Sequence, residues 1–182
     1  MNVICFGDSN TYGYDPRGCF GGRYDADSRW VDILAARTGW NIKNEGMNGR
    51  ELPCGAISVP SVPEDTDLLI VMLGTNDLLQ GRSVDAAAAG MEKLVTGLTR
   101  GKILLIGPPP MQLGAWVPAQ GLIDASKDLN RAYKALAQRL GIRFADAGAW
   151  NISLAFDGVH FTEEGHRAFA EGLYQELTEG NE

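Results

Sequence analysis

The chain has 182 residues, of which 45% are hydrophobic and 21% are charged, and its formal net charge is -7 at pH 7. A chain of this length and composition can bury a substantial core, which excludes a disordered, collagen-like or coiled-coil protein. The acidic balance also argues against a general affinity for nucleic acid or anionic membranes, since either would need a basic surface.

Short apolar runs alternate along the chain with longer segments of helical periodicity, the pattern of a parallel sheet covered by helices. A first strand is predicted over 2–7, a helix over 30–38 that ends before Gly39, and a second strand over 41–45. The apolar run LLIVML at 68–73 indicates a central strand that is buried on both faces.

The second half of the chain continues this alternation. Ser83 is a favourable N-cap for a helix that extends to about residue 98, and a fourth strand over 102–106 is stopped by Gly107 and three prolines. A helix over 125–140, a fifth strand over 142–145 and a helix from the N-cap Thr162 to residue 177 follow. We therefore expect residues 1–182 to form a single domain, a three-layer α/β/α sandwich with a doubly wound sheet of five parallel strands.

Cysteine usage and targeting signals indicate the cellular setting. Cys5 lies in an apolar run and is predicted to be a buried small hydrophobic residue, whereas Cys19 and Cys54 lie in loop-like sequence. With no secretion signal, free thiols are favoured at these two positions, and a disulfide between them is the alternative. Because no segment approaches the roughly 20 apolar residues that span a bilayer, we expect a cytoplasmic protein without membrane insertion. No Cys/His spacing resembles a zinc site, and neither a dinucleotide-binding glycine pattern nor a phosphate-binding loop is present, so neither a metal nor a cofactor is expected.

Polar residues follow the strands at the sheet edge where ligands bind in such folds, beyond the carboxyl ends of the strands. In strand order, these segments are 8–10, 46–49, 74–77, 108–110 and 157–160. Together they contain a serine hydroxyl, a carboxylate–histidine pair, an amide side chain and several glycines. These groups are the parts of an acyl-transfer site, which needs a nucleophile, a base, a group that orients the base, and donors for an oxyanion.

The spacing Asp157-x-x-His160 suits the base and the group that orients it. A tight turn at Gly158 would bring the Asp157 carboxylate to Nδ1 of His160 and leave Nε2 facing Ser9. Taken alone, this spacing occurs more often by chance on a loop. The only other histidine, His166, lies one turn into the final helix and is interpreted as a solvated helix residue.

Four separated segments resemble the motifs of the SGNH hydrolases, also called the GDSL esterase and lipase family. They are FGDSNTYG at 6–13, NEGMNG at 44–49, GTND at 74–77 and DGVHF at 157–161, and they occur in the family's order. The resemblance implies a flavodoxin-like fold, with Ser9 as nucleophile, His160 as base and Asp157 as its orienter. It also implies an oxyanion hole formed by the backbone N–H groups of Ser9 and Gly49 and the side chain of Asn76. Gly49 is preferred over Gly46 because the family's second glycine lies at the end of the turn, three residues beyond Gly46.

One residue departs from the family name: Asn10 stands where leucine would be, and we expect it to affect packing or substrate fit rather than activity. Within the family, the sequences around Ser9, around 29–30 and at 107–110 look most like bacterial arylesterases and acyltransferases that handle short acyl groups. Members of that subgroup carry a larger insertion that makes contacts between subunits, and because the stretch 49–67 is short we do not expect this insertion here. The oligomeric state is therefore left open, with a homo-oligomer as one alternative.

Other residues near the site have two interpretations each. Tyr12, Met111, Trp116 and Phe161 are candidates for the substrate pocket, and ordinary core packing is the alternative for all four. The alternative for the glycine-rich 7–13 segment is a tight turn with no other role, and the alternative for the Asn-Asp pair at 76–77 is that it only caps the turn that follows it. Asp8 is interpreted as structural, and Arg50 as a surface side chain.

The resulting hypothesis is a serine esterase that hydrolyses small, short-acyl carboxylic esters through an acyl-enzyme intermediate and also passes the acyl group to alcohols. The enzymatic alternatives are a carbohydrate O-acetyl esterase and a thioesterase or lysophospholipase. A non-catalytic binding domain is the alternative from another class, although every catalytic role has a candidate residue. The expected partner is a small-molecule ester, with no nucleic acid.

Overall fold

The computed structural model describes residues 1–18, 22–53, 62–98 and 101–179 of the chain. Its main sheet has five strands in the order β4-β1-β5-β6-β7, and every neighbouring pair is parallel. These strands are β1 (Asn2–Gly7), β4 (Asn41–Gly46), β5 (Leu68–Met72), β6 (Lys102–Gly107) and β7 (Arg143–Asp146). This arrangement confirms the predicted doubly wound parallel sheet.

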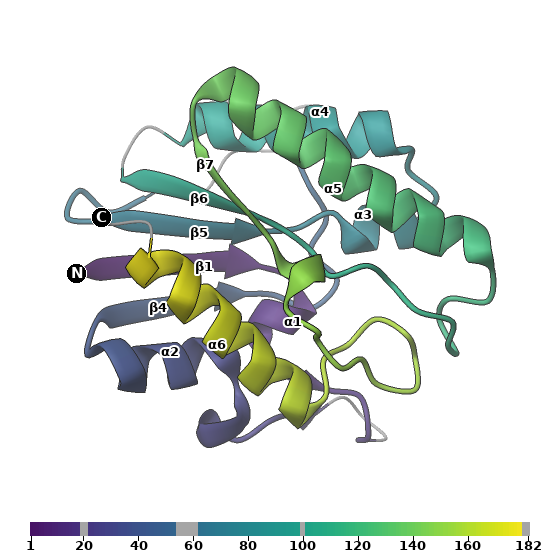
Figure 1. Ribbon diagram of the computed structural model, residues 1–182, viewed down its shortest axis with the longest axis horizontal. Helices are drawn as coiled ribbons and strands as arrows, with labels where there is room; N and C mark the ends of the chain where they lie inside the picture. The colour runs from purple at the N-terminus through teal and green to yellow at the C-terminus, as the bar shows by residue number, and fades with distance from the viewer. Residues whose placement is uncertain (19–21, 54–61, 99–100, 180–182) are drawn as a thin grey trace.

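Four longer helices cover the two faces of this sheet (Figure 1). On one face lie α2 (Trp30–Thr38) and α6 (Glu163–Glu179), and on the other lie α4 (Val84–Gly97) and α5 (Gln120–Leu140). The shorter elements are the helices α1 (Ser9–Tyr12), α3 (Thr75–Leu79), η1 (Ala26–Ser28) and η2 (Ala147–Ala149), and the hairpin strands β2 (Tyr14–Asp15) and β3 (Gly22–Arg23). The three-layer sandwich is therefore confirmed.

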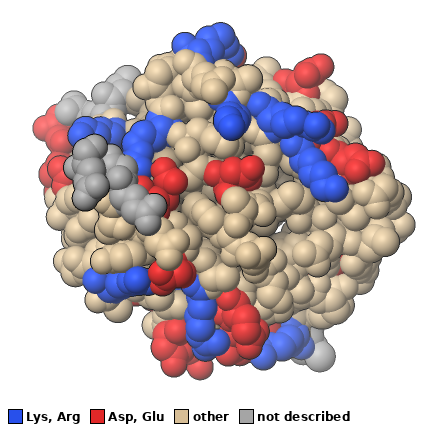
Figure 2. Space-filling model, viewed as in Figure 1, with Lys and Arg blue, Asp and Glu red and all other residues tan. Residues whose placement is uncertain are grey.

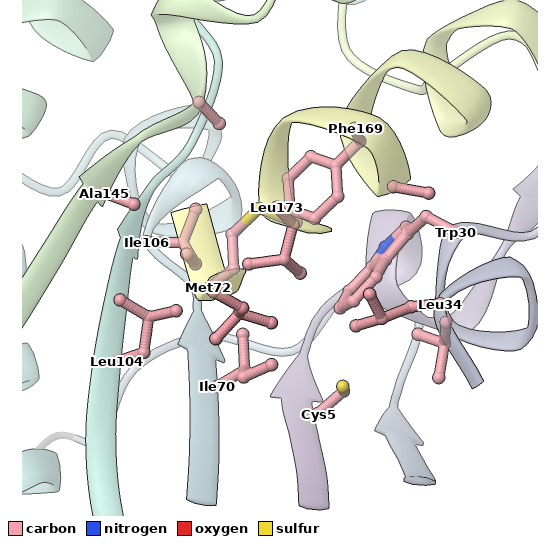
Figure 3. Close-up of a cluster of buried hydrophobic side chains, with 14 of the residues drawn as sticks. Cys5, Trp30, Leu34, Ile70, Met72, Leu104, Ile106, Ala145, Phe169 and Leu173 are labelled. Carbon is pink, nitrogen blue, oxygen red and sulfur yellow. The ribbon is translucent and has the colours of Figure 1, made fainter. Parts of the chain in front are cut away.

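The central strand β5 shows how the sequence divides the core into two layers. Ile70 and Met72 pack with the residues of α2 and α6, whereas Leu69 and Val71 pack with those of α4 and α5. Side chains of a strand alternate between its two faces, so a continuous apolar run supplies both layers at once. Figure 3 shows the first layer, in which Trp30 of α2 lies beside the strand residues.

The bounds of the strands and long helices agree with the predictions to within two residues, except at the start of α5. This helix begins at Gln120 instead of residue 125. The extra turn carries Leu122 and Ile123, which pack against the core layer below α5, and a hydrogen bond of 3.0 Å joins Gln120 to Asp124. Tertiary packing therefore extends the helix beyond its periodic segment.

Cys5 is fully buried in the first layer, as predicted, and burial raises the pKa of its thiol well above the ordinary value. Cys19, Cys54 and the rest of the 54–61 segment within the short 49–67 stretch lie outside the described residues. Within the described part of the chain, each helix is too short or too polar to cross a membrane. Acidic and basic side chains are interspersed over the face of the molecule that Figure 2 shows.

Candidate active site

The segment after β1 places Ser9 at the start of the one-turn helix α1. Asp8 caps this helix, because its carboxylate accepts a hydrogen bond of 3.0 Å from the backbone N–H of Asn10. The helix lies directly against the end of β4, where a Cβ added to Gly46 would be 2.1 Å from the backbone nitrogen of Tyr12. Asp8 is therefore structural, as expected, and its burial raises the pKa of its carboxyl to about 6.

The loop that carries the predicted base turns tightly around Gly158. One oxygen of Asp157, Oδ1, accepts hydrogen bonds of 2.9 Å from the backbone N–H groups of Val159 and His160. Gly158 has a φ of 81°, and an added Cβ would be 2.1 Å from the backbone oxygen of Gln112. Both the left-handed conformation and the lack of space require glycine here. The turn that the sequence predicted is present.

The structure brings the three predicted residues into one hydrogen-bonded line. The second oxygen of Asp157 lies 2.7 Å from Nδ1 of His160, and Nε2 of His160 lies 3.0 Å from Oγ of Ser9. When Nδ1 carries the proton and donates to the carboxylate, Nε2 is left as the acceptor for the serine proton. A hydroxyl, an imidazole and a carboxylate in this order can carry out nucleophilic acyl transfer.

The charge of the Asp157 carboxylate is supported by its surroundings. Burial raises its pKa, but the hydrogen bonds from the His160 side chain and from the His160 and Val159 backbones outweigh that effect, and the pKa falls below the ordinary value. The side chains of Asp157 and His160 are almost fully buried. An ionised and buried carboxylate therefore faces the imidazole.

Two aromatic rings flank the imidazole of His160. Their centroids lie 4.6 Å away for Tyr14 and 4.9 Å away for Trp116. Tyr14 belongs to the short hairpin strand β2, whereas the backbone N–H of Trp116 donates to the Asp157 carbonyl at 3.0 Å. The sequence singled out Trp116 but missed Tyr14, because no periodic signal marks a two-residue strand.

The predicted oxyanion donors lie after three neighbouring strands. Ser9 follows β1, Gly49 lies in a turn after β4, and Asn76 lies in α3 after β5. The turn is closed by a 3.1 Å hydrogen bond from Arg50 N to Met47 O, and Nδ2 of Asn76 donates to Arg50 O at 3.1 Å. The Gly49 turn and the Asn76 amide are thus held together at the switch point between β1 and β5.

Arg50 is not the surface side chain that the sequence suggested. Its Nη1 donates to the carbonyl of Gly7 at 2.9 Å and also to that of Glu45, and its guanidinium lies 4.1 Å from the ring centroid of Phe6. These contacts tie the turn that contains Gly49 to the ends of β1 and β4. The expectation was wrong because the carbonyls at both strand ends need donors, and only the fold brings them within reach of this side chain.

The side chains of residues 76–77 do more than cap the turn that follows them, which was the alternative interpretation. Gly74 is the N-cap residue of α3, and no side chain caps the helix. Asp77 is instead fully buried, accepts hydrogen bonds from the backbone N–H of Leu52 and forms an ion pair with Arg82. The pair thus holds residues 50–52 from both sides, Asn76 through the Arg50 carbonyl and Asp77 through the Leu52 N–H.

The four predicted pocket residues differ in how much of each side chain is exposed to solvent. Trp116 is 50% exposed beside His160, which suits a substrate contact. Tyr12 is partly buried, and the guanidinium of Arg23 lies 4.5 Å from its ring centroid. Phe161 is instead buried in the core, because it is 0% exposed to solvent and packs against Phe169. The pocket prediction is therefore wrong for this residue. The physical reason is that burial stabilises a large apolar ring, and the fold places this one among the aromatic rings of the core.

Met111 is almost fully buried against α5, in the second core layer. It also lines a hollow of about 660 Å³ together with Pro110, Leu113, Ile123 and Ile152. The residues around this hollow include neither Ser9 nor His160. Core packing, the alternative interpretation, therefore describes Met111 better.

His166 differs from its prediction as well, because it is fully buried. Its Nδ1 lies 3.5 Å from the backbone N–H of Trp30, and its Nε2 has no hydrogen-bond partner among the described residues. The ring packs edge-on against the rings of Tyr24 and Phe161, with a distance of 5.3 Å between ring centroids in both cases. Burial, with a smaller contribution from the nearby charge of Arg29, lowers the pKa of His166 to about 3. The first turn of α6 faces the aromatic core, which its sequence position alone did not reveal.

Among the residues that the structure describes, no three His, Cys, Asp or Glu side chains are grouped so that they could hold a metal ion.

Comparisons with known proteins identify the family and the fold. The chain matches the GDSL-like lipase/acylhydrolase family over residues 5–168. It is similar to the structure of the native aryl esterase of M. smegmatis, with 28% identity, a TM-score of 0.85, and coverage of 98% of this chain and 99% of that chain. A carbohydrate acetylesterase from Sinorhizobium meliloti has 28% identity and a TM-score of 0.79 over the same shares of the two chains. A member of the lipolytic protein G-D-S-L family from Veillonella parvula DSM 2008 has 27% identity and a TM-score of 0.77, with 98% of each chain covered. No curated protein sequence matches the chain.

Proposed function

The chain belongs to the GDSL-like lipase/acylhydrolase family and is an ester-hydrolysing enzyme, and from this premise we propose that it cleaves small, short-acyl esters with Ser9 as nucleophile. The observation that carries the proposal is the line of contacts from Asp157 through His160 to Ser9, with distances of 2.7 and 3.0 Å. The nearly complete burial of His160 and Asp157 supports it, because a protected imidazole–carboxylate pair holds its geometry through the reaction.

In the first half of the proposed reaction, Oγ of Ser9 attacks the ester carbonyl carbon while Nε2 of His160 takes the hydroxyl proton. The carbonyl electron pair moves to the oxygen, and the imidazolium that forms is stabilised by the ionised Asp157. His160 then gives its proton to the leaving alcohol as the C–O bond breaks, which leaves an acyl group on Ser9. Water repeats the sequence in the second half and releases the carboxylic acid.

The negative oxygen of the tetrahedral intermediate needs hydrogen-bond donors. We assign this role to the backbone N–H groups of Ser9 and Gly49 and to the second amide proton of Asn76, the first being donated to the Arg50 carbonyl. Rigid donors are already oriented when the charge develops, so they stabilise the transition state without reorganisation. The hydrogen bonds around residues 47–50 and 76–77 supply this rigidity.

Exposed apolar side chains near the site favour an ester with a small apolar or ring-shaped group. Met47, Trp116 and Phe156 are 51%, 50% and 67% exposed, and they lie on loops that follow β4 and β6 and that precede Asp157. A half-exposed indole beside the base could receive an aryl leaving group or the face of a sugar. The same surface would admit an alcohol in place of water, which would make the enzyme an acyltransferase as well.

A carbohydrate O-acetyl esterase is the second candidate. The similarity to the carbohydrate acetylesterase from Sinorhizobium meliloti favours it, because that chain matches this one over nearly its full length. Its substrate would use the same nucleophile and base, so the two candidates differ only in the group that is released.

Labelling and a substrate panel test the proposal. A fluorophosphonate probe should modify the wild-type protein at Ser9, and the label and all ester turnover should be lost in Ser9→Ala. Turnover of p-nitrophenyl acetate and octanoate, acetylated sugars, acyl-CoA and lysophospholipid then ranks the substrate classes. A folded wild-type protein that takes no label and turns over none of these esters would overturn the proposal. Preference for the acyl-CoA or lysophospholipid would replace the short-ester assignment by the corresponding alternative.

A further inference from the structure

Asn10 lies next to the proposed nucleophile, and its side chain faces the loop that carries the proposed base. It is only 5% exposed. Its Nδ2 donates to the carbonyl of Val159 at 3.1 Å, and its Oδ1 accepts from the N–H of Phe161 at 2.9 Å. These are the residues immediately before and after His160. The side chain therefore does not reach into the substrate space, contrary to one of the roles expected for it.

The backbone of Asn10 is held by two further hydrogen bonds. Its backbone N–H donates to the Asp8 carboxylate at 3.0 Å, and its backbone carbonyl accepts from the indole N–H of Trp30 at 2.9 Å. The side chain then pairs with the loop as a neighbouring strand would, using one donor and one acceptor. The backbone of the nucleophile helix is thus tied to the backbone on both sides of His160.

Such a tie matters because the direct contact between nucleophile and base cannot hold them in place. The 3.0 Å hydrogen bond between Ser9 Oγ and His160 Nε2 is lost whenever the serine carries an acyl group. On the far side, the loop is fixed by backbone bonds, from Gln112 to Gly158 and from Trp116 to Asp157, and neither reaches the nucleophile helix. Among the described side chains next to the nucleophile, the side-chain amide of Asn10 makes the hydrogen bonds that join the nucleophile helix to the loop of His160.

We propose that Asn10 is a positioning residue, which holds the base loop at the distance where His160 reaches Ser9 throughout the catalytic cycle. The inference rests on the roles proposed above for those two residues. Leucine in its place would leave the Val159 carbonyl and the Phe161 N–H buried without partners, and the loop would shift to satisfy them. A displacement of about 1 Å in a catalytic geometry can lower the rate by roughly 100-fold.

Asn10→Leu tests the proposal against a matched control. Asn130 is also a buried asparagine that ties a loop to a helix, because its Nδ2 donates to the Pro108 carbonyl at 2.8 Å and to Asp146 at 3.1 Å. We expect Asn10→Leu to lower kcat by about 10- to 100-fold with KM within about twofold, and Asn130→Leu to destabilise the fold while the folded enzyme keeps its kcat. A wild-type kcat in folded Asn10→Leu, an equal loss of kcat in both variants, or a raised KM at unchanged kcat would overturn it.

Asn10→Asp gives a second reading that does not depend on tolerance of leucine. The carboxylate keeps the size and can accept from Phe161, but when ionised it cannot donate to the Val159 carbonyl; when protonated it can. The ratio of its kcat to the wild-type kcat at the same pH should therefore rise as the pH falls. A ratio near one at every pH would refute the positioning role. The proposed function is read separately, from wild-type turnover and its loss in Ser9→Ala.

Discussion

The two histidines of the chain stand six positions apart and are both buried, with exposures of 2% for His160 and 0% for His166, yet their surroundings differ. The ring of His160 has a polar side chain at each nitrogen, Asp157 on one side and Ser9 on the other. The ring of His166 has a distant backbone N–H at Nδ1 and aromatic edges around it.

This difference shows that burial alone does not make a base. Taking an imidazole out of water disfavours its protonated form, which is why the pKa of His166 falls to about 3. A buried base accepts a proton during catalysis far more readily where an anion is in place to stabilise the cation. In this chain the Asp157 turn supplies that anion for His160, and no carboxylate takes the same place beside His166 among the hydrogen bonds of the described residues.

Removing each imidazole in turn gives the largest expected contrast. His160→Ala should lower kcat by about 10⁴-fold or more, because no group would accept the Ser9 proton. His166→Asn retains a small acceptor near the Trp30 N–H and should change kcat by less than about threefold, since it lies outside the reacting line. Steady-state kinetics on a p-nitrophenyl ester measures both. Comparable losses in two folded variants would abolish the distinction.

Changing only the carboxylate sharpens the comparison, because it gives His160 a neutral neighbour, as His166 has. In Asp157→Asn, Oδ1 can still accept from the Val159 and His160 backbones, while the amide N–H₂ faces Nδ1 and moves the ring proton to Nε2. The wrong tautomer cannot take the serine proton, and kcat should fall by about 10⁴-fold with little change in KM. Thermal unfolding checks that the turn persists. If turnover stays near normal, Asp157 only shapes the loop.

The oxyanion side gives an intermediate effect. Asn76→Ala leaves the line from Asp157 to Ser9 intact and should lower kcat by roughly 10²- to 10³-fold if the amide stabilises the oxyanion. Kinetics with a short ester gives the ratio, and the unfolding temperature reports what the lost bond to the Arg50 carbonyl costs in stability. An unchanged kcat would assign Asn76 to the support of the 50–52 segment alone.

The smallest effect concerns stability in acid. The pKa of His166 is lowered from 6.5 to about 3 in the fold. Between these two pH values the unfolded chain therefore binds a proton that the folded chain does not bind. Its contribution is present above pH 6.5 and is lost as the pH falls from 6.5 toward 3. His166→Asn should therefore lose less of its free energy of unfolding between pH 7 and pH 4 than the wild type, as denaturant titrations at each pH would show. Parallel curves for the two proteins would mean that His166 is accessible to protons.

Much of the fold followed from local patterns. The run at 68–73 predicted a central strand, and Ser83 caps α4 through a 3.2 Å hydrogen bond from Ala86, as its residue type suggested. The start of α5, the one-turn helices α1 and α3 and the β2–β3 hairpin were beyond such patterns. These elements are too short to show a period, and packing against the rest of the protein fixes them.

The sequence by itself determined the order of the strands and helices, the loops that carry the polar residues and the turn that Gly158 requires. Only the tertiary structure decided which of those residues meet. Phe161 lies in the core, and His166 is enclosed by aromatic rings. Tyr14 lies against the imidazole of His160, and the Asn10 side chain forms hydrogen bonds with the residues before and after His160. The physical reason is that secondary structure depends on the periodicity of nearby residues, whereas a side chain's partners come from segments up to 151 positions away and are fixed by packing.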